Sequence, residues 1–91
     1  MTRLNCFFRA KEGKYEEALT AAKSLVKESL TQEGCIAYDV FESATRKDIF
    51  MICETWANEE VLNDHSKSNP FTKYVGIMET CGELKLEKFN F

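Results

Sequence analysis

Residues 35–56, CIAYDVFESATRKDIFMICETW, contain two runs typical of β-strands with a short polar segment between them. Residues 35–41 and 49–56 are rich in aromatic and β-branched side chains, which fit the pleated surface of a strand. The segment 43–47 that separates them is polar and short enough for a hairpin loop. This stretch therefore predicts an antiparallel β-hairpin.

Before the hairpin, the sequence predicts a strand followed by a helix. Residues 2–11 alternate along the chain with the period of a strand, with apolar side chains at every second position. Residues 14–30 place apolar side chains three and four positions apart, and Glu16 and Glu17 provide negative charge in the first turn. This second pattern predicts an amphipathic helix.

After the hairpin, the sequence predicts two helices and a last strand. Asn58 can cap a short helix, and Pro70 suits the first position of the helix that follows it. Gly82 is expected to close this second helix in a left-handed conformation. The apolar positions of residues 83–91 change phase, so we expect a β-bulge near Glu87.

The resulting order, β-α-β-β-α-β, predicts a ferredoxin-like α+β fold in one domain, residues 1–91, with a four-stranded antiparallel sheet and helices on one face. The third strand is apolar on both faces, whereas two helices can cover only one of them. Its two faces carry Phe50, Ile52 and Trp56 on one side and Ile49, Met51 and Cys53 on the other. The uncovered face is most simply buried against a second copy, which predicts a homodimer.

The composition argues against nucleic acid and membrane partners. The 91 residues carry 12 Lys and Arg against 15 Asp and Glu, a net charge of −3, so we expect no basic surface for a phosphate backbone. No apolar run approaches the roughly 20 residues that cross a bilayer, and no apolar signal stretch follows Met1. We therefore expect a cytoplasmic protein.

The sequence shows no pattern typical of a metal or cofactor site. The four cysteines are far apart, His65 is the only histidine, and no Gly-rich phosphate loop or dinucleotide fingerprint is present. The cysteines, which are Cys6, Cys35, Cys53 and Cys81, are best interpreted as reduced, half-buried strand residues, with disulfides or metal binding as alternatives. We expect a protein that works without cofactor or metal.

Glu54 is the only carboxylate in the apolar third strand, and a buried carboxylate needs a partner. If the hairpin pairs Glu42 with Asp48, Tyr38 lies diagonally beside Glu54 and its hydroxyl can serve as that partner. An ion pair at the sheet edge or with a second chain is the alternative.

His65, expected at the end of the short helix, could be aimed at the same sheet face as Glu54. Histidine titrates near neutrality, so the two side chains would form a proton-transfer pair. The alternative is a surface histidine at a helix end.

Asn5 and three aromatic side chains are candidates for ligand contacts. Asn5 could donate an amide hydrogen bond to a ligand oxygen, although a position on the dimer face explains it equally well. Trp56, Phe50 and Phe71 could form an aromatic wall for a planar ligand, although such residues more often belong to the core.

Three segments together resemble the antibiotic biosynthesis monooxygenase domain. They are EGCIAY at 33–38, F-x-x-x-E-x-W at 50–56 and L-x-x-H-x-x-S-x-x-F at 62–71. The resemblance covers nearly the whole chain and implies a ferredoxin-like subunit that forms a dimeric α+β barrel, with a pocket between the sheet and the helices. His65, Glu54, Trp56 and Tyr38 fall on motif positions of the family, whereas Asn5 does not.

For some members, the resemblance also implies oxygenation of quinol-like substrates without metal, flavin or haem. The same domain is similar to isomerases of small phosphorylated sugars and to haem-degrading enzymes, but the latter carry tryptophan where this chain has His65. The leading interpretation is thus a cofactor-independent monooxygenase acting on a small aromatic or quinol-like molecule. A small-molecule isomerase or other proton-transfer enzyme, and a non-catalytic ligand-binding or stress-response module, are the alternatives.

Overall fold

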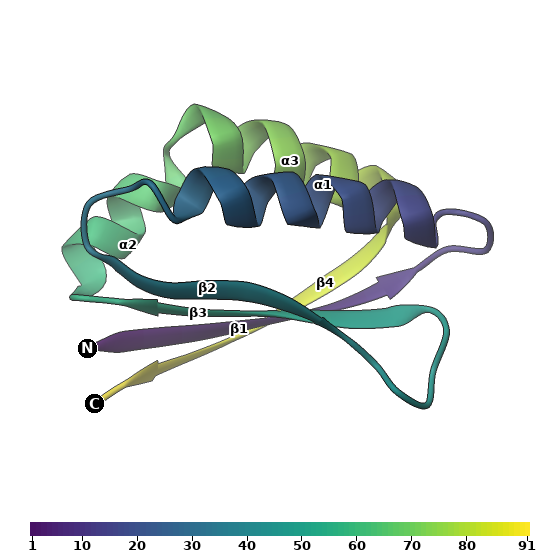
Figure 1. Cartoon of the computed structure of the whole chain (residues 1–91), viewed down its shortest axis with the longest axis horizontal. Coiled ribbons are helices and arrows are strands. Elements are labelled where there is room, and N and C mark those ends of the chain that lie inside the picture. The colour runs from purple at the N-terminus through teal and green to yellow at the C-terminus, as the bar shows by residue number, and fades with distance from the viewer.

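A computed structural model describes the whole chain, residues 1–91 (Figure 1). Its elements, in chain order, are β1 (Thr2–Ala10), α1 (Tyr15–Ser29), β2 (Cys35–Glu42), β3 (Ile49–Trp56), α2 (Glu59–Ser66), α3 (Asn69–Cys81) and β4 (Gly82–Asn90). The strands form one antiparallel sheet in the order β2-β3-β1-β4, and the helices lie over one of its faces. The predicted α+β ferredoxin-like fold is confirmed. None of the helices combines the length and the hydrophobicity that a membrane-spanning helix requires.

Side-chain caps begin the two helices that follow the hairpin. The Asn58 side chain accepts a hydrogen bond from the backbone N–H of Val61 at 3.0 Å, as the sequence predicts. At α3, Ser68 is the cap and Pro70 lies in the first turn, where its missing N–H is not needed. The Ser68 hydroxyl also donates to the backbone oxygen of His65 at 2.7 Å, which fixes the end of α2 against the start of α3.

The hairpin has a different register from the predicted one. Tyr38 lies directly opposite Glu54, so the expected pairing of Glu42 with Asp48 is wrong by two positions. The physical reason lies in the loop, where the Ser43 hydroxyl accepts hydrogen bonds from two backbone N–H groups, at 3.3 and 3.1 Å. These bonds stabilise a wider turn outside the ladder.

Gly82 does not end α3 in a left-handed conformation, as the sequence suggested. Its φ of 172° and ψ of −155° are extended, and α3 passes directly into β4. Glycine is required for a different reason: a Cβ at this position would lie 2.0 Å from the backbone oxygen of Arg9 on the neighbouring strand. The close approach of β4 to β1, and not backbone handedness, explains this residue.

The expected bulge near Glu87 is also wrong, because β4 pairs with β1 without a register shift from Gly82 to Asn90. The change of apolar phase has a simpler cause, since Leu86 and Phe89 lie on opposite faces of a regular strand. The irregularity of the sheet lies instead in β2, between Cys35 and Ala37.

The layer between the helices and the sheet is partly filled by an aromatic cluster. The rings of Phe8 and Phe50 stack with their centroids 4.7 Å apart, and Tyr15 meets Phe50 edge-on at 5.8 Å. Ala18 and Ala22 of α1 are fully buried, and their small side chains let the helix approach the sheet closely. None of these five residues lines the cavity described below.

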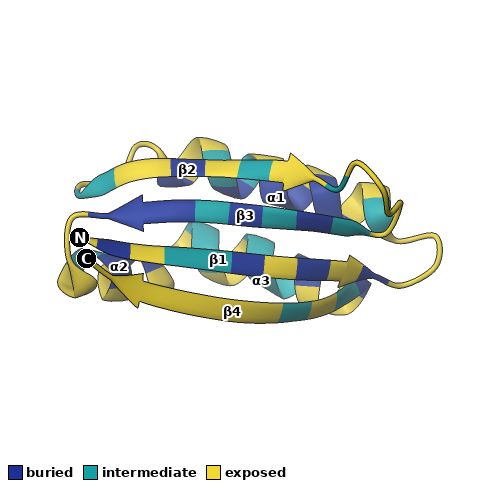
Figure 2. Cartoon of the chain, turned by 90° about the horizontal axis from the view of Figure 1, so that it is seen from below, coloured by how far each residue is buried: buried dark blue, intermediate teal, exposed yellow.

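The other face of the sheet has no covering helix (Figure 2). Phe41, Met51 and Phe7 lie side by side across β2, β3 and β1 on this face. Phe41 is 53% exposed and Phe7 is 38% exposed. This part of the outer face is therefore apolar and open in the single chain.

Candidate active site

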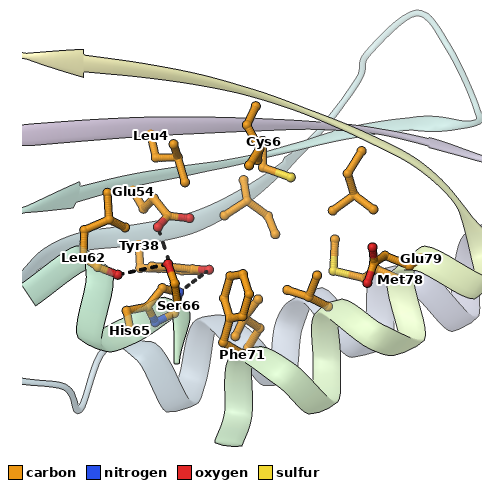
Figure 3. A pocket seen from close by; sticks show the side chains of 15 residues that line it. Leu4, Cys6, Tyr38, Glu54, Leu62, His65, Ser66, Phe71, Met78 and Glu79 are labelled. Atoms are coloured by element: carbon orange, nitrogen blue, oxygen red, sulfur yellow. Dashed lines mark hydrogen bonds and ion pairs between the residues drawn. The ribbon is translucent and has the colours of Figure 1, made fainter. Parts of the chain in front are cut away.

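A cavity of about 390 Å³ lies between the sheet and the helices α2 and α3 (Figure 3). Fifteen residues line it, and 11 of them are hydrophobic. The polar lining residues include Glu54, His65 and Glu79, whereas no lysine or arginine lines the cavity. Leu86 on β4 lines it and is 60% exposed, so this wall of the cavity is accessible from the edge of the sheet.

Glu54 reaches the cavity from the middle of β3 and is only 3% exposed. The indole Nε1–H of Trp56 donates a hydrogen bond of 2.8 Å to Glu54 Oε1. Burial raises the pKa of Glu54 to about 7, although hydrogen bonds from Trp56 and Tyr38 act in the opposite direction. The carboxyl group therefore changes its charge near neutral pH.

His65 reaches the cavity from the last turn of α2 and is 1% exposed. Its Nδ1 lies 2.7 Å from Gln32 Oε1, and its Nε2 lies 3.4 Å from the Tyr38 hydroxyl and 4.0 Å from Glu54 Oε1. Burial lowers the pKa of His65 to about 4, so the imidazole is neutral at pH 7.

Aromatic rings hold the imidazole in place. Trp56 lies against it with 4.6 Å between ring centroids, and Phe71 meets it edge-on at 5.2 Å. Tyr38 completes the enclosure at 5.4 Å, and its own hydroxyl stays protonated because burial and the charge of Glu54 raise its pKa. The hydroxyl is therefore a hydrogen-bond donor at neutral pH.

A neutral imidazole beside a carboxyl group that titrates near pH 7 can accept and return a proton. The sequence predicted that His65 and Glu54 share one pocket on the helix-covered face, and the structure confirms this placement. The 4.0 Å between Nε2 and Oε1 is too long for a direct hydrogen bond. The two groups are neighbours that a substrate or a proton could bridge.

The other predicted site residues are divided between the cavity and the rest of the fold. Tyr38 and Phe71 line the cavity, whereas Trp56 lies behind the lining and holds Glu54 and His65. Phe50 does not contribute to a ligand wall: it stacks on Phe8 in the core, because four positions on β3 separate it from Glu54.

Asn5 does not reach the cavity. Strand alternation places it on the outer face of the sheet, opposite Cys53 on β3 and Glu87 on β4. Its Oδ1 is buried and has no hydrogen-bond partner in the single chain. Asn5 therefore belongs with the outer face and not with a ligand in this cavity.

Gln32 and Cys6 are site residues that the sequence reasoning did not identify. Gln32 lies in the segment between α1 and β2, and no pattern in this segment distinguishes it as a partner of His65. Cys6 could have been found, because it shares its strand face with Leu4 and lines the cavity. Burial, followed by the nearby charge of Glu54, raises the pKa of the Cys6 thiol to about 12, so this thiol is a poor nucleophile.

No group of three or more His, Cys, Asp or Glu side chains is arranged to hold a metal ion. All four cysteines are free.

Comparisons with known proteins identify the family of this chain. A family model described as antibiotic biosynthesis monooxygenase matches residues 1–76. The Bacillus subtilis protein "Putative monooxygenase YcnE" is 33% identical over 75 residues, which are 82% of this chain and 79% of that protein.

Solved structures extend the likeness to the whole fold. A Bacteroides thetaiotaomicron protein, described as of unknown function and a possible oxidoreductase, is 58% identical, with a TM-score of 0.96 over 99% of this chain and 96% of that one. A conserved protein from Methanosarcina mazei is 27% identical, with a TM-score of 0.92 over 98% and 90% of the two chains. The chain belongs to the antibiotic biosynthesis monooxygenase family.

Proposed function

We propose that this chain is a cofactor-independent monooxygenase that acts on a small aromatic or quinol-like molecule. Its family and the names of its relatives support a monooxygenase-like function in general terms. The observation that carries the finer proposal is the neutral His65 Nε2 beside Glu54 in an apolar cavity. This arrangement suits the removal of one proton from an electron-rich ring system.

The reaction begins when His65 Nε2 takes a proton from an activated CH₂ or ring position of the substrate. The carbanion then passes an electron to dioxygen, and the two radicals combine to form a C–O bond. The resulting peroxide anion takes the proton back from the imidazolium and loses water, which leaves a carbonyl group. One oxygen atom enters the product and the other enters water, so the four electrons removed from carbon reduce one dioxygen molecule.

The lining of the cavity supports an uncharged substrate. Glu54 and Glu79 are the carboxyl groups of the lining, and no lysine or arginine accompanies them. A phosphorylated or carboxylated ligand would meet like charge and lose its hydration without gaining a cationic partner. This argues against an isomerase of phosphorylated sugars and favours a neutral ring compound.

We also propose that the protein acts as a homodimer joined through the outer sheet face, in the dimeric α+β barrel form. The exposed rings of Phe41 and Phe7 support this, because a second copy would bury them. The unpaired Oδ1 of Asn5 lies on the same face and would gain a donor there. The free cysteines suit the reducing cytoplasm.

A second proton-transfer reaction, isomerisation of an uncharged ketone, is the other candidate. The pKa of Glu54 near 7 favours it, because the carboxyl group could return the proton at a second carbon of the substrate. Such a reaction would consume no dioxygen.

Turnover of a panel of quinols and anthrone-like compounds, measured with and without air, tests the proposal. We expect dioxygen and substrate to disappear in equal amounts, and His65→Ala to lower kcat by about a hundredfold or more. Lys67→Ala, an exposed change two residues away, is the matched control and should keep full activity.

Product formation without dioxygen would refute the monooxygenase proposal and support the isomerase. Tight binding of a compound without turnover of any compound would support the alternative of a non-catalytic ligand-binding or stress-response module.

A further inference from the structure

We propose that Gln32 is a positioning residue that keeps the imidazole proton of His65 on Nδ1 and so leaves Nε2 free to accept a proton in the cavity. The catalytic meaning of this inference rests on the proposed function. The position of the proton does not depend on that function, and it can be measured without any substrate.

The contact between the two side chains determines the direction of the hydrogen bond. Gln32 Oε1 lies 2.7 Å from His65 Nδ1, well within hydrogen-bond distance. An amide oxygen can only accept, so Nδ1 must carry the proton in this contact. In a neutral imidazole, Nε2 is then left with a lone pair.

On the other side of the ring, Glu54 is the competing acceptor. A charged carboxylate beside Nε2 would favour a proton on that nitrogen and thereby remove the base. However, Glu54 Oε1 lies 4.0 Å from Nε2 and already accepts the indole N–H of Trp56 at 2.8 Å. The short bond to Gln32 therefore opposes the charge of Glu54 and decides the tautomer.

The Tyr38 hydroxyl agrees with the same tautomer. It lies 3.4 Å from Nε2 and 5.4 Å separates the two rings, so the single hydroxyl proton can be donated to the bare nitrogen whenever it is not donated to Glu54. The reverse tautomer would place an N–H opposite this hydroxyl and leave Gln32 Oε1 facing an unprotonated Nδ1. That second arrangement sets two acceptors against each other in a buried site.

Gln32 and His65 also line a second, smaller cavity. About 210 Å³ of space is lined by Gln32, Glu33, Val61, Asp64 and His65, and His65 is the only residue that lines both this cavity and the large one. The titratable groups around the imidazole are thus Glu33 and Asp64 on one side and Glu54 and Tyr38 on the other.

Nitrogen NMR of the uniformly ¹⁵N-labelled protein tests the inference directly, because the chain has a single histidine and its two ring nitrogens need no residue assignment. At about pH 8, where an ordinary histidine is neutral, we expect Nδ1 to carry the proton. A parent protein with the proton mainly on Nε2 would overturn the proposal.

Three substitutions sharpen the test. Gln32→Leu keeps the size of the side chain but removes the acceptor, and we expect the proton to move to Nε2. Gln32→Glu should hold the proton on Nδ1 and raise the midpoint of the histidine titration, because a carboxylate also stabilises the imidazolium. Glu33→Gln changes a neighbour in the same cavity and is the control, with no change of tautomer expected. An unchanged tautomer in Gln32→Leu would overturn the proposal.

Turnover separates this inference from the proposed function. On a substrate that the parent oxidises, Gln32→Leu should lower kcat about tenfold or more with KM unchanged, and Gln32→Glu should restore activity with a shifted pH profile. If the NMR tautomers behave as expected while kcat is the same in all variants, Gln32 positions the proton but His65 is not the base. The proposed role of His65 as the base would then fail, and the positioning role of Gln32 would stand.

Discussion

Replacing Glu54 by Gln should stabilise the folded protein at alkaline pH. The pKa of Glu54 rises from 4.5 to about 7 on folding because the carboxyl group is buried. The folded state therefore binds this proton more tightly than the unfolded state, so stability is complete below about pH 4.5 and falls as the pH rises through 7. Each pKa unit corresponds to 1.36 kcal/mol, so the ionised carboxylate costs the folded state about 3 kcal/mol at pH 8. Gln has nearly the same shape and can still accept from the indole of Trp56.

Urea unfolding of the parent and of Glu54→Gln, at one fixed protein concentration, measures this effect. The stability of the variant relative to the parent should increase by about 3 kcal/mol between about pH 4.5 and pH 8. Glu28→Gln alters an exposed carboxylate on α1 and is the matched control. If the difference between parent and Glu54→Gln is constant across this pH range, the carboxyl group has an ordinary pKa and the account of the site is wrong.

Three further changes test separate parts of the structure. Tyr38→Phe removes the hydroxyl beside His65 Nε2 and should lower kcat about tenfold on a quinol that the parent oxidises. The free energy of unfolding should change by less than about 1 kcal/mol. Trp56→Phe removes the donor to Glu54 and should destabilise the protein by about 2 kcal/mol at pH 8, and by less in acid, as urea unfolding at both pH values will show. Met51→Asp should convert a dimer into monomers of 10.5 kDa in sedimentation; a variant that stays dimeric would move the interface away from the outer face.

Hydrophobic periodicity predicts most elements of this fold, because elements such as β1 and α1 mark the face they bury with apolar residues. It fails where contacts with backbone atoms determine the strand register or the residue that a position requires. The hairpin register depends on the turn that Ser43 stabilises, and Gly82 is explained by the backbone of Arg9 in a strand far away in sequence. Neither contact leaves a periodic pattern that can be seen in advance.

The candidate site, like the fold, is predictable from the sequence only in part. Strand alternation places Glu54 on the helix-covered face, and the short connection to α2 returns His65 over it, so their meeting follows from sequence. Gln32 does not follow, because a loop residue gives no period and its partner is 33 positions away. Phe50 was misjudged for a different reason: it shares a face with Glu54, but a face does not specify which part of it a cavity occupies.

The pairing of Glu54 with His65 reverses the usual order of their acidities. In water a carboxylic acid loses its proton before an imidazolium does, at pKa values of 4.5 and 6.5, and the two groups form an ion pair. In this cavity burial takes the pKa of Glu54 to about 7 and that of His65 to about 4, so the uncharged forms are favoured together in mildly acidic solution. An uncharged aromatic ligand can then enter without separating an ion pair. In such solution the pair carries no charge until the substrate gives up its proton, which Nε2 is placed to accept.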